Sequence, residues 1–206
     1  MKTLLQINSG MRGSASQSSM LADKIAASLL DRMPAAVHIK RDLSDDIIPH
    51  LDQHTFLAFS DPTVACTPSQ KAGLALSDTL VSELEAADAL VLGAPMYNLM
   101  IPSTLKSWLD YVSRAGRTFA FSQAGPIGLL KGKKAYIAMA QGGQFLGTPA
   151  DLESGYLRMA LGLLGIVDIK FIYAEGLAMG PEAAEAGLAD AHRQIGAIFE
   201  QALEAI

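Results

Sequence analysis

Residues 3–19 read TLLQINSGMRGSASQSS, and this stretch decides the fold class. Thr3 to Asn8 is a short apolar run, which is typical of a buried strand, and it ends in Ser9 and Gly10. A polar loop then leads into a helix predicted from Ser18 to about Met33, where Leu21, Ile25 and Leu29 recur at helical spacing. A strand, a polar loop and a helix in this order open an α/β domain.

The same alternation continues along the chain. Further strands are predicted at Ala36–Arg41, Ala87–Gly93, Lys134–Ala140 and Val167–Glu175. Helices are predicted around Leu76–Leu84, after Pro102, from Pro149 to about Leu164, and from Pro181 onward. The strands are nearly continuous apolar runs, as a parallel sheet covered on both faces requires. We therefore expect one α/β domain over residues 1–206, with a doubly wound five-stranded parallel sheet and helices on both faces.

The stretch from Asp42 to about Pro68 interrupts this pattern. It is too long for an ordinary connection, so we expect a functional excursion. Its large apolar residues follow no clear helical or strand period: they are Ile47, Ile48, Leu51, Phe56, Leu57 and Phe59. Such residues either form an interface or fold over their own domain as a lid.

Composition excludes several classes of function. The net charge is -5 and there is no basic run, so neither nucleic acid nor an anionic membrane is an expected partner. Cys66 is the only cysteine, which excludes an internal disulfide and a cysteine zinc cluster, and we expect its thiol to be inert. The histidines lack metal-ligand spacing, so no metal is expected. MKTLLQINSG resembles neither a signal peptide nor a membrane span, and we expect a cytoplasmic protein.

The loop after the first strand is the first candidate site. Ligands of open parallel sheets bind beyond the carboxyl ends of the strands, where the strand order reverses. Residues 10–19 offer four serines, an arginine (Arg12) and the amides of a helix N-terminus, which together favour a bound phosphate. The alternative is a solvated loop with a serine cap. Because the G-x-G-x-x-G pattern is absent, the phosphate of a mononucleotide is favoured over a dinucleotide.

Two further loops follow predicted strands. Gly93 to Pro102 combines an aromatic, an amide and large apolar residues between prolines, which suits a wall for a flat ring. The alternative is a simple connection with Met96 and Tyr97 in the core. Gln141 to Gly147 contains paired glycines, which let backbone amides approach a ligand closely, although an ordinary turn also uses them.

Several motifs together resemble one enzyme family. They are Ser16-x-Ser18, Pro95-Met96-Tyr97-Asn98, Ile101-Pro102-Ser103, Leu105-Lys106 and Trp108-Leu109-Asp110, followed by Thr118-Phe119, Gly125-Pro126, Gly132-Lys133-Lys134 and Gly142-Gly143. In this combination the chain resembles the FMN-dependent NADH:azo/quinone oxidoreductases. The likeness runs from the first strand to the last helix, and the PMYN loop followed by IPSTLKSWLD is its most specific part.

The resemblance implies a flavodoxin-like homodimer that carries FMN. Its members pass two electrons from NADH or NADPH to quinones and to azo compounds in a ping-pong cycle. The flavin carries the hydride chemistry, so no catalytic side chain is implied. By position, Ser16, Gln17 and Ser18 would hold the phosphate, Pro95 to Leu99 would line the isoalloxazine, and Gly142 and Gly143 would meet its pyrimidine edge.

Three departures from the family pattern affect this assignment. Gly10-Met11 stands where the family often has Ser-Pro, and Ser9 could substitute there. Ala140-Gln141 replaces a common Ser-Arg pair, and Leu99 replaces a common Phe. We also expect Phe119, Phe121 and Phe145 as substrate-lining candidates, with a place in the core as the alternative for Phe119 and Phe121.

Two other functions remain open at this stage. A flavodoxin-like one-electron carrier would need a strongly acidic docking face, whereas this chain is only mildly acidic. A flavin-loaded regulatory module would need a partner surface that the sequence does not reveal. Steady NADH consumption with a quinone separates an enzyme from both.

Overall fold

A computed structural model describes residues 2–60 and 67–204, so the predictions for Cys66 and for part of the excursion fall outside the described residues. Five parallel strands form the central sheet in the order β2-β1-β3-β6-β7. They are β1 (Thr3–Asn8), β2 (Val37–Asp42), β3 (Ala89–Pro95), β6 (Lys134–Ala140) and β7 (Asp168–Ala174). The predicted fold class is confirmed.

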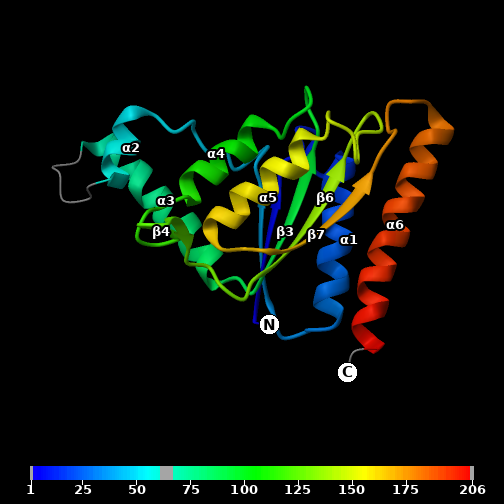
Figure 1. The fold of residues 1–206 in the computed structure, drawn as a ribbon, viewed down its shortest axis with the longest axis horizontal. Coiled ribbons are helices and arrows are strands. Elements are labelled where there is room, and N and C mark those ends of the chain that lie inside the picture. Colours follow the sequence, from blue (N-terminus) through cyan, green and yellow to red (C-terminus); the bar gives the residue numbers. More distant parts are fainter. Residues whose placement is uncertain (1, 61–66, 205–206) are drawn as a thin grey trace.

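Helices cover both faces of this sheet (Figure 1). Helices α1 (Gln17–Asp31) and α6 (Pro181–Glu204) pack on one face against Leu4, Val91 and Ala138. On the other face, α3 (Pro68–Ala86), α4 (Ser103–Val112) and α5 (Leu152–Leu164) pack against Leu5, Leu92 and Ile137. Because side chains alternate along a strand, each apolar strand supplies both layers of the core.

The excursion is more regular than the sequence indicated. It contains a helix, α2 (Gln53–Ser60), in a stretch predicted to be irregular. Asp52 accepts a hydrogen bond from the Thr55 amide at 2.7 Å and so helps begin this helix. The helix has only 8 residues, and Ala58 is buried while Phe56 and Leu57 are exposed. Such a short helix with an exposed apolar face gives no clear period, which explains the wrong prediction.

A second element was not predicted. Strands β4 (Phe119–Ser122) and β5 (Gly125–Gly128) form an antiparallel hairpin outside the main sheet. The strands have only 4 residues each, so neither shows a sequence period. The hairpin follows the C-terminal end of α4 and lies at the same end of the molecule as α2 (Figure 1).

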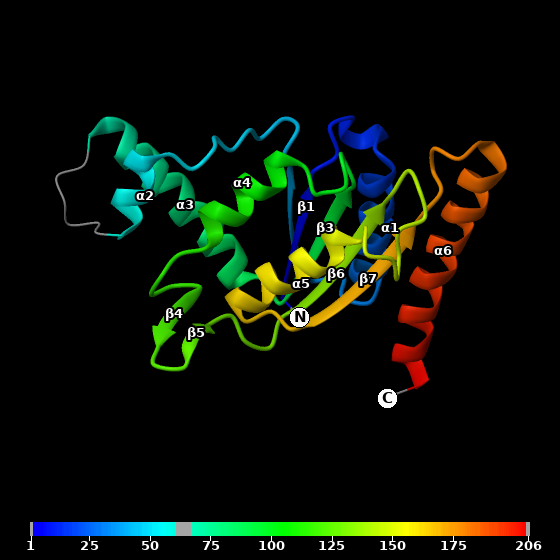
Figure 2. The same ribbon diagram turned by 45° about the horizontal axis from the view of Figure 1, so that its top comes forward.

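The strand order places the three candidate loops together. From β1 the chain moves outward to β2, and from β3 it moves the opposite way to β6, so β1 and β3 flank the switch point. Because all five strands are parallel, the loops after β1, β3 and β6 leave the same edge of the sheet (Figure 2). A short 3-10 turn, η1 (Gly13–Ala15), lies in the first of them.

Candidate functional site

The start of α1 lacks the side-chain cap that its sequence provides for. Ser16 is the N-cap residue, yet its side chain makes no capping hydrogen bond. Instead its Oγ lies 3.1 Å from the Oγ of Ser18, and both residues are buried. The first-turn amides of an α-helix have no partner within the helix. Paired hydroxyls and free amides therefore meet at the positive end of this helix, which suits an anion.

Gly10 makes room for the two serines. A Cβ atom at Gly10 would lie 2.1 Å from the Ser16 Oγ, a distance that no side chain can occupy. Ser9 has a different role, because its hydroxyl donates to the Gly93 carbonyl oxygen at 2.7 Å and joins the ends of β1 and β3. Arg12 is exposed and Gln17 is half-buried at the first position of α1. Gly10, Ser16 and Ser18 are thus packed directly against one another at the start of α1, and a side chain at position 10 would displace Ser16.

The loop after β3 forms a tight turn from Tyr97 to Met100. Their backbones exchange hydrogen bonds of 2.9 and 3.2 Å, with Asn98 at φ 52° and Leu99 at φ 67° between them. Positive φ at both central positions is the pattern of a type I′ turn. Asn tolerates this backbone well, whereas Leu is strained in it, and such strain is often found at functional sites. The turn holds the half-exposed Leu99 side chain outward.

The loop after β6 is fastened through its carbonyl groups. The oxygens of Gln141, Gly142 and Gly143 accept hydrogen bonds of 2.9–3.1 Å from the amides of residues 176–178. Within residues 2–60 and 67–204, the amides of Gly142 and Gly143 donate to no protein acceptor. The Phe145 ring lies close to Gly143, since a Cβ there would be 2.9 Å from it. The loop therefore presents two free backbone donors beside an aromatic ring.

Hydrogen bonds connect the three loops. The Met11 amide donates to the Tyr97 hydroxyl oxygen at 3.2 Å, and the Met96 amide donates to the Ala140 carbonyl oxygen at 2.9 Å. Tyr97 therefore positions the first loop against the second, and Ala140 acts through its backbone. These contacts bring most of the predicted site residues to one edge of the sheet.

Phe119 and Phe121 are not brought to this edge. They lie on β4, beyond the C-terminal end of α4, whereas the Tyr97–Met100 turn precedes its N-terminal end. The 10 residues of α4 separate the two ends by about 15 Å at 1.5 Å per residue. Their rings contact each other edge to face at 5.3 Å between centroids. A single chain therefore does not bring these two rings to the candidate site, whereas the Phe145 ring lies beside Gly143. The expectation that the three rings line a substrate site stays a prediction.

Glu153 is a feature that the sequence analysis missed. It lies in the first turn of α5 and is fully buried, and burial raises the pKa of its carboxyl from 4.5 to about 8. The side chain of Gln141, also fully buried, lies against it and lowers that pKa to a smaller extent. A signal was available, because Glu153 precedes Leu157 and Leu161 by four and eight residues and so shares their buried face.

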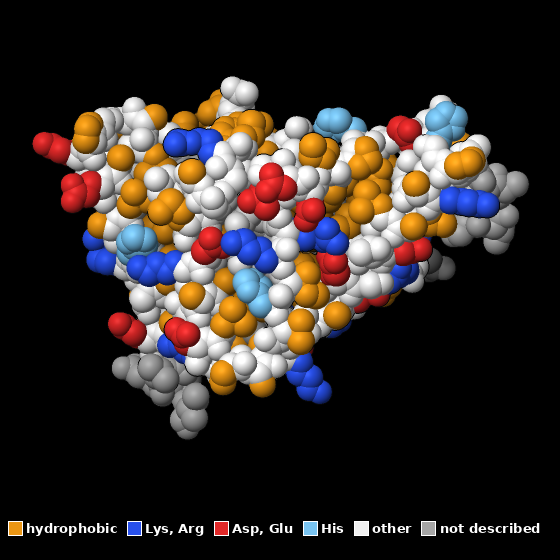
Figure 3. Space-filling model, turned by 180° about the vertical axis from the view of Figure 1, so that it is seen from behind, with side chains coloured by type: hydrophobic (Ala, Val, Ile, Leu, Met, Phe, Trp, Pro, Cys, Tyr) orange, Lys and Arg blue, Asp and Glu red, His pale blue; other side chains and the backbone are white. Residues whose placement is uncertain are grey.

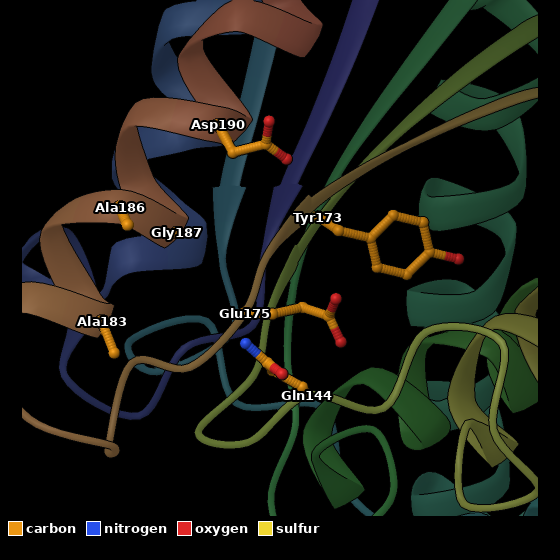
Figure 4. Close-up of a pocket in the computed structure, with 7 residues that line it drawn as sticks. All are labelled: Gln144, Tyr173, Glu175, Ala183, Ala186, Gly187 and Asp190. Atoms are coloured by element: carbon orange, nitrogen blue, oxygen red, sulfur yellow. The ribbon is translucent and has the colours of Figure 1, made fainter.

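Another cavity adjoins the site but has the wrong charge for phosphate. It has a volume of about 250 Å³ and lies between β7 and α6, with Gln144, Glu175 and Asp190 among its lining residues (Figure 4). In Figure 4 the Asp190 carboxylate extends from α6 toward the sheet, and the Glu175 side chain extends from the end of β7 beside Gln144. Glu175 accepts hydrogen bonds from the Phe145 and Leu146 amides, so it supports the loop after β6.

The described residues contain neither a metal-binding cluster nor a membrane-spanning helix. Acidic and basic side chains are interspersed on the face shown in Figure 3. Across residues 2–60 and 67–204, no group of three or more His, Cys, Asp or Glu side chains could hold a metal ion. None of the described helices has both the length and the apolar character needed to cross a bilayer.

Comparison with known proteins shows the family to which this chain belongs. The family model described as flavodoxin-like fold matches residues 1–199. FMN-dependent NADH:quinone oxidoreductase 6 from Burkholderia lata is 47% identical over 197 residues, which cover 96% of this chain and 100% of that protein. This chain belongs to the flavodoxin-like FMN-dependent NADH:quinone oxidoreductase family. Another member, from Dechloromonas aromatica, is 47% identical over 93% of this chain and 96% of its own length.

Solved structures confirm the fold of this family member. An azoreductase from Bacillus anthracis superposes with a TM-score of 0.88 at 24% identity, covering 98% of this chain and 100% of its own. An FMN-dependent NADH-azoreductase from the same species, solved in complex with FMN, gives a TM-score of 0.84 at 21% identity, covering 96% of this chain and 99% of its own. At these identities the likeness establishes the flavodoxin-like architecture alone.

Proposed function

We propose that this protein is an FMN-dependent oxidoreductase that passes two electrons from NADH or NADPH to quinones, and also to azo compounds, in a ping-pong cycle. The observation that carries the proposal is the uncapped start of α1. Its cap serine lies 3.1 Å from a second buried serine instead of closing the helix end. This arrangement lies at the switch point of the sheet, where open α/β domains bind their ligands. The relatives of this chain are named for FMN and NADH.

The residues of the first loop fit an FMN phosphate. The hydroxyls of Ser16 and Ser18 and the amide of Gln17 would donate to its oxygens, and the helix dipole adds a favourable field. Gly10 allows the two serines to pack against the loop, because a side chain at this position would collide with Ser16. Arg12 is exposed in the same loop, and its positive charge would favour a bound anion. Ser9 holds β1 and β3 in register below them.

The other two loops fit the ring. Pro95 to Leu99 form a wall whose turn is fixed by its own backbone hydrogen bonds. The free amides of Gly142 and Gly143 would donate to the pyrimidine edge, where negative charge gathers on reduction, and would stabilise that charge. When bound, FMN supplies the two-electron chemistry. The chain's own residues would bind and orient it, and donor and acceptor would occupy the same place beside it in turn.

We further propose that the protein is a homodimer in which the partner's hairpin covers the ring. Phe119 and Phe121 do not reach the site of their own chain, and Phe121 is 78% exposed. Phe145 would line the acceptor side from within the same chain. A cytoplasmic location stays a prediction.

Purification and reduction test the function. The protein should be yellow, should release FMN on denaturation, and should consume NADH steadily when a quinone is supplied. Reduction of the bound flavin by NADH without turnover on any quinone or azo dye would instead favour an electron carrier. Release of FAD alone, or failure to bind FMN after reconstitution, would contradict the proposal.

A further inference from the structure

The strongest unexplained feature outside the proposed binding contacts is the pair of Gln141 and Glu153. Both side chains are fully buried. Both polar atoms of the Gln141 side chain and both carboxyl oxygens of Glu153 lack a hydrogen bond of standard geometry within the described residues. Buried polar groups nearly always have partners, so four unsatisfied atoms on two adjacent side chains call for an explanation.

The chemistry of the Gln141 amide and the Glu153 carboxyl supplies an explanation. A protonated carboxyl can donate its O–H to an amide oxygen while its C=O accepts from the amide N–H. Such a cyclic pair would satisfy all four atoms. An ionised carboxyl has no proton to donate, so it would leave the amide oxygen unpaired and bury a charge.

The position of the pair links it to the site. Gln141 directly precedes Gly142 and Gly143, whose amides are free, and its carbonyl accepts from Leu177 at 3.1 Å. Glu153 belongs to α5, which is fixed in the core by Leu157 and Leu161. A bond between the two side chains therefore ties the loop after β6 to a rigid helix.

We propose that Glu153 and Gln141 form a buried carboxyl–amide latch, which holds residues 141–143 where the amides of Gly142 and Gly143 reach a bound flavin. Glu153 is thus a positioning residue. The latch itself depends only on this chain, whereas the identity of the ligand rests on the proposed function.

The charged surroundings favour the closed latch near neutral pH. Burial raises the pKa of Glu153 to about 8, and the negative charge of Asp151, the N-cap of α5, opposes ionisation further. On neighbouring elements, Glu175 is bonded to the Phe145 and Leu146 amides, and Lys106 is paired with Asp110 on α4. Tyr173 lies on the neighbouring strand β7, and burial raises the pKa of its hydroxyl. The latch should open as the pH rises through about 8.

Amide hydrogen exchange tests the latch without any cofactor. The amides of Gly176, Leu177 and Ala178 donate to the loop carbonyls, so they report how firmly the loop is held. Their protection factors should fall about tenfold in the native sequence as Glu153 ionises. In Glu153→Gln they should stay constant, because the introduced amide can still pair with Gln141 at every pH. In Glu153→Leu they should be low throughout.

FMN binding tests the consequence for the site. The dissociation constant for FMN, followed by flavin fluorescence, should rise about tenfold across the same pH range in the native sequence. It should stay flat in Glu153→Gln. Glu182→Gln makes the same substitution at an exposed position of α6 and should follow the native curve.

Two results would overturn the proposal. One is equal pH dependence of amide protection in the native protein and Glu153→Gln. The other is a pH step in protection without a matching step in FMN affinity, which would remove the link to the site. A protein that binds no FMN at any pH would refute the proposed function instead, and the exchange data would still decide whether the latch exists.

Discussion

Ser16 occupies a position where a serine side chain usually accepts a hydrogen bond from the first turn of its helix. Here that side chain faces Ser18 at 3.1 Å and leaves the amides of the turn unpaired. Giving up a cap costs about 1 kcal/mol of stability. A bound phosphate would recover this cost, because hydrogen bonds to charged groups each contribute about 1.5–3 kcal/mol.

Replacing both serines tests that role. Ser16→Ala with Ser18→Ala should lower FMN affinity by at least about tenfold, because two donors to a charged group are lost. Riboflavin has no phosphate, so its affinity should change much less. Titration of the apoprotein with each flavin measures both constants. Ser14→Ala removes an exposed hydroxyl from the same loop and should change neither. An equal loss for riboflavin and FMN would contradict the assignment.

Glu153 links stability to pH with a definite sign. Its folded-state pKa of about 8 lies above the ordinary value of 4.5, so between these values only the folded protein holds the proton. The stabilisation from this group is complete below about pH 4.5 and is lost as the pH rises through about 8. At about 1.4 kcal/mol per pKa unit, the total change is on the order of a few kcal/mol.

Glu153→Gln should remove this pH dependence. Relative to the native protein, the variant should gain unfolding free energy steadily from about pH 5 to about pH 8 and level off above that. Urea unfolding at several pH values measures the difference. A constant difference across this range would show that Glu153 is ionised in the folded protein. Glu182→Gln, on an exposed first turn, should give no such trend.

The polar loops could be located from the sequence, whereas the hydrogen bonds within them could not. The serines and paired glycines were visible as composition, whereas the use of the Ser9 hydroxyl by Gly93 depends on the pairing of β1 with β3. Glu153 was missed because an acid in the first turn of a helix is normally exposed and favoured there by the helix dipole. Its burial follows from the packing of α5 over the end of β6.

At the scale of elements, α6 packs closely on the end of β7 through one glycine. A Cβ atom at Gly187 would lie 2.0 Å from the Glu175 carbonyl oxygen, so any side chain would push the helix away. Gly196 lies two and a half turns further along the same helix, and a Cβ there would meet nothing closer than 4.0 Å. The two glycines therefore differ in role despite their equal helix propensity.

This difference predicts opposite effects on stability. Gly187→Ala should destabilise the protein by about 1–3 kcal/mol through overpacking. Gly196→Ala should stabilise it by about 0.5–1 kcal/mol, because alanine is the better helix former. Urea unfolding measures both. Since Glu175 also supports the Phe145 and Leu146 amides, Gly187→Ala should weaken FMN binding as well, whereas Gly196→Ala should not. Stabilisation by both changes would contradict the packing argument.

The main elements could be predicted because their apolar periods are long. All five strands of the sheet and the helices α1, α4, α5 and α6 were placed within a few residues, whereas α3 begins at Pro68, eight residues before the predicted Leu76. Some helix ends differ from the prediction because a side-chain hydrogen bond fixes them. The helix expected from Pro149 begins at Leu152, since the Asp151 side chain accepts a hydrogen bond from the Ser154 amide. Short elements such as α2 and the β4–β5 hairpin are fixed by tertiary contacts, for example the ring contact of Phe59 with Tyr111 at 5.6 Å between centroids.

For the whole molecule, the excursion divides into an inward and an outward set of apolar residues. Ile48 is buried, and Phe59 packs on Tyr111 and beneath the Arg114 guanidinium. Phe56 is 56% exposed and faces a groove of about 310 Å³ that Phe121 of the hairpin also lines. The excursion is therefore only partly a lid on its own domain, and its outward set suits an interface.

A charge introduced into this groove should separate a dimer. Phe56→Asp with Phe121→Asp should convert the protein to a species of 21.8 kDa in light scattering, because two carboxylates would have to be buried in the interface. Both side chains are exposed in the single chain, so the fold should survive, which circular dichroism can check.

Phe59 is unsuitable for this test because its ring supports Tyr111. Val37→Asp with Val167→Asp, at exposed positions near the amino ends of β2 and β7, is the matched control and should stay dimeric. If the partner's hairpin covers the ring, NADH oxidation should fall together with the dimer. A native mass of 21.8 kDa at micromolar concentration would refute the dimer. A monomeric variant with full activity would instead show that each chain completes its own site.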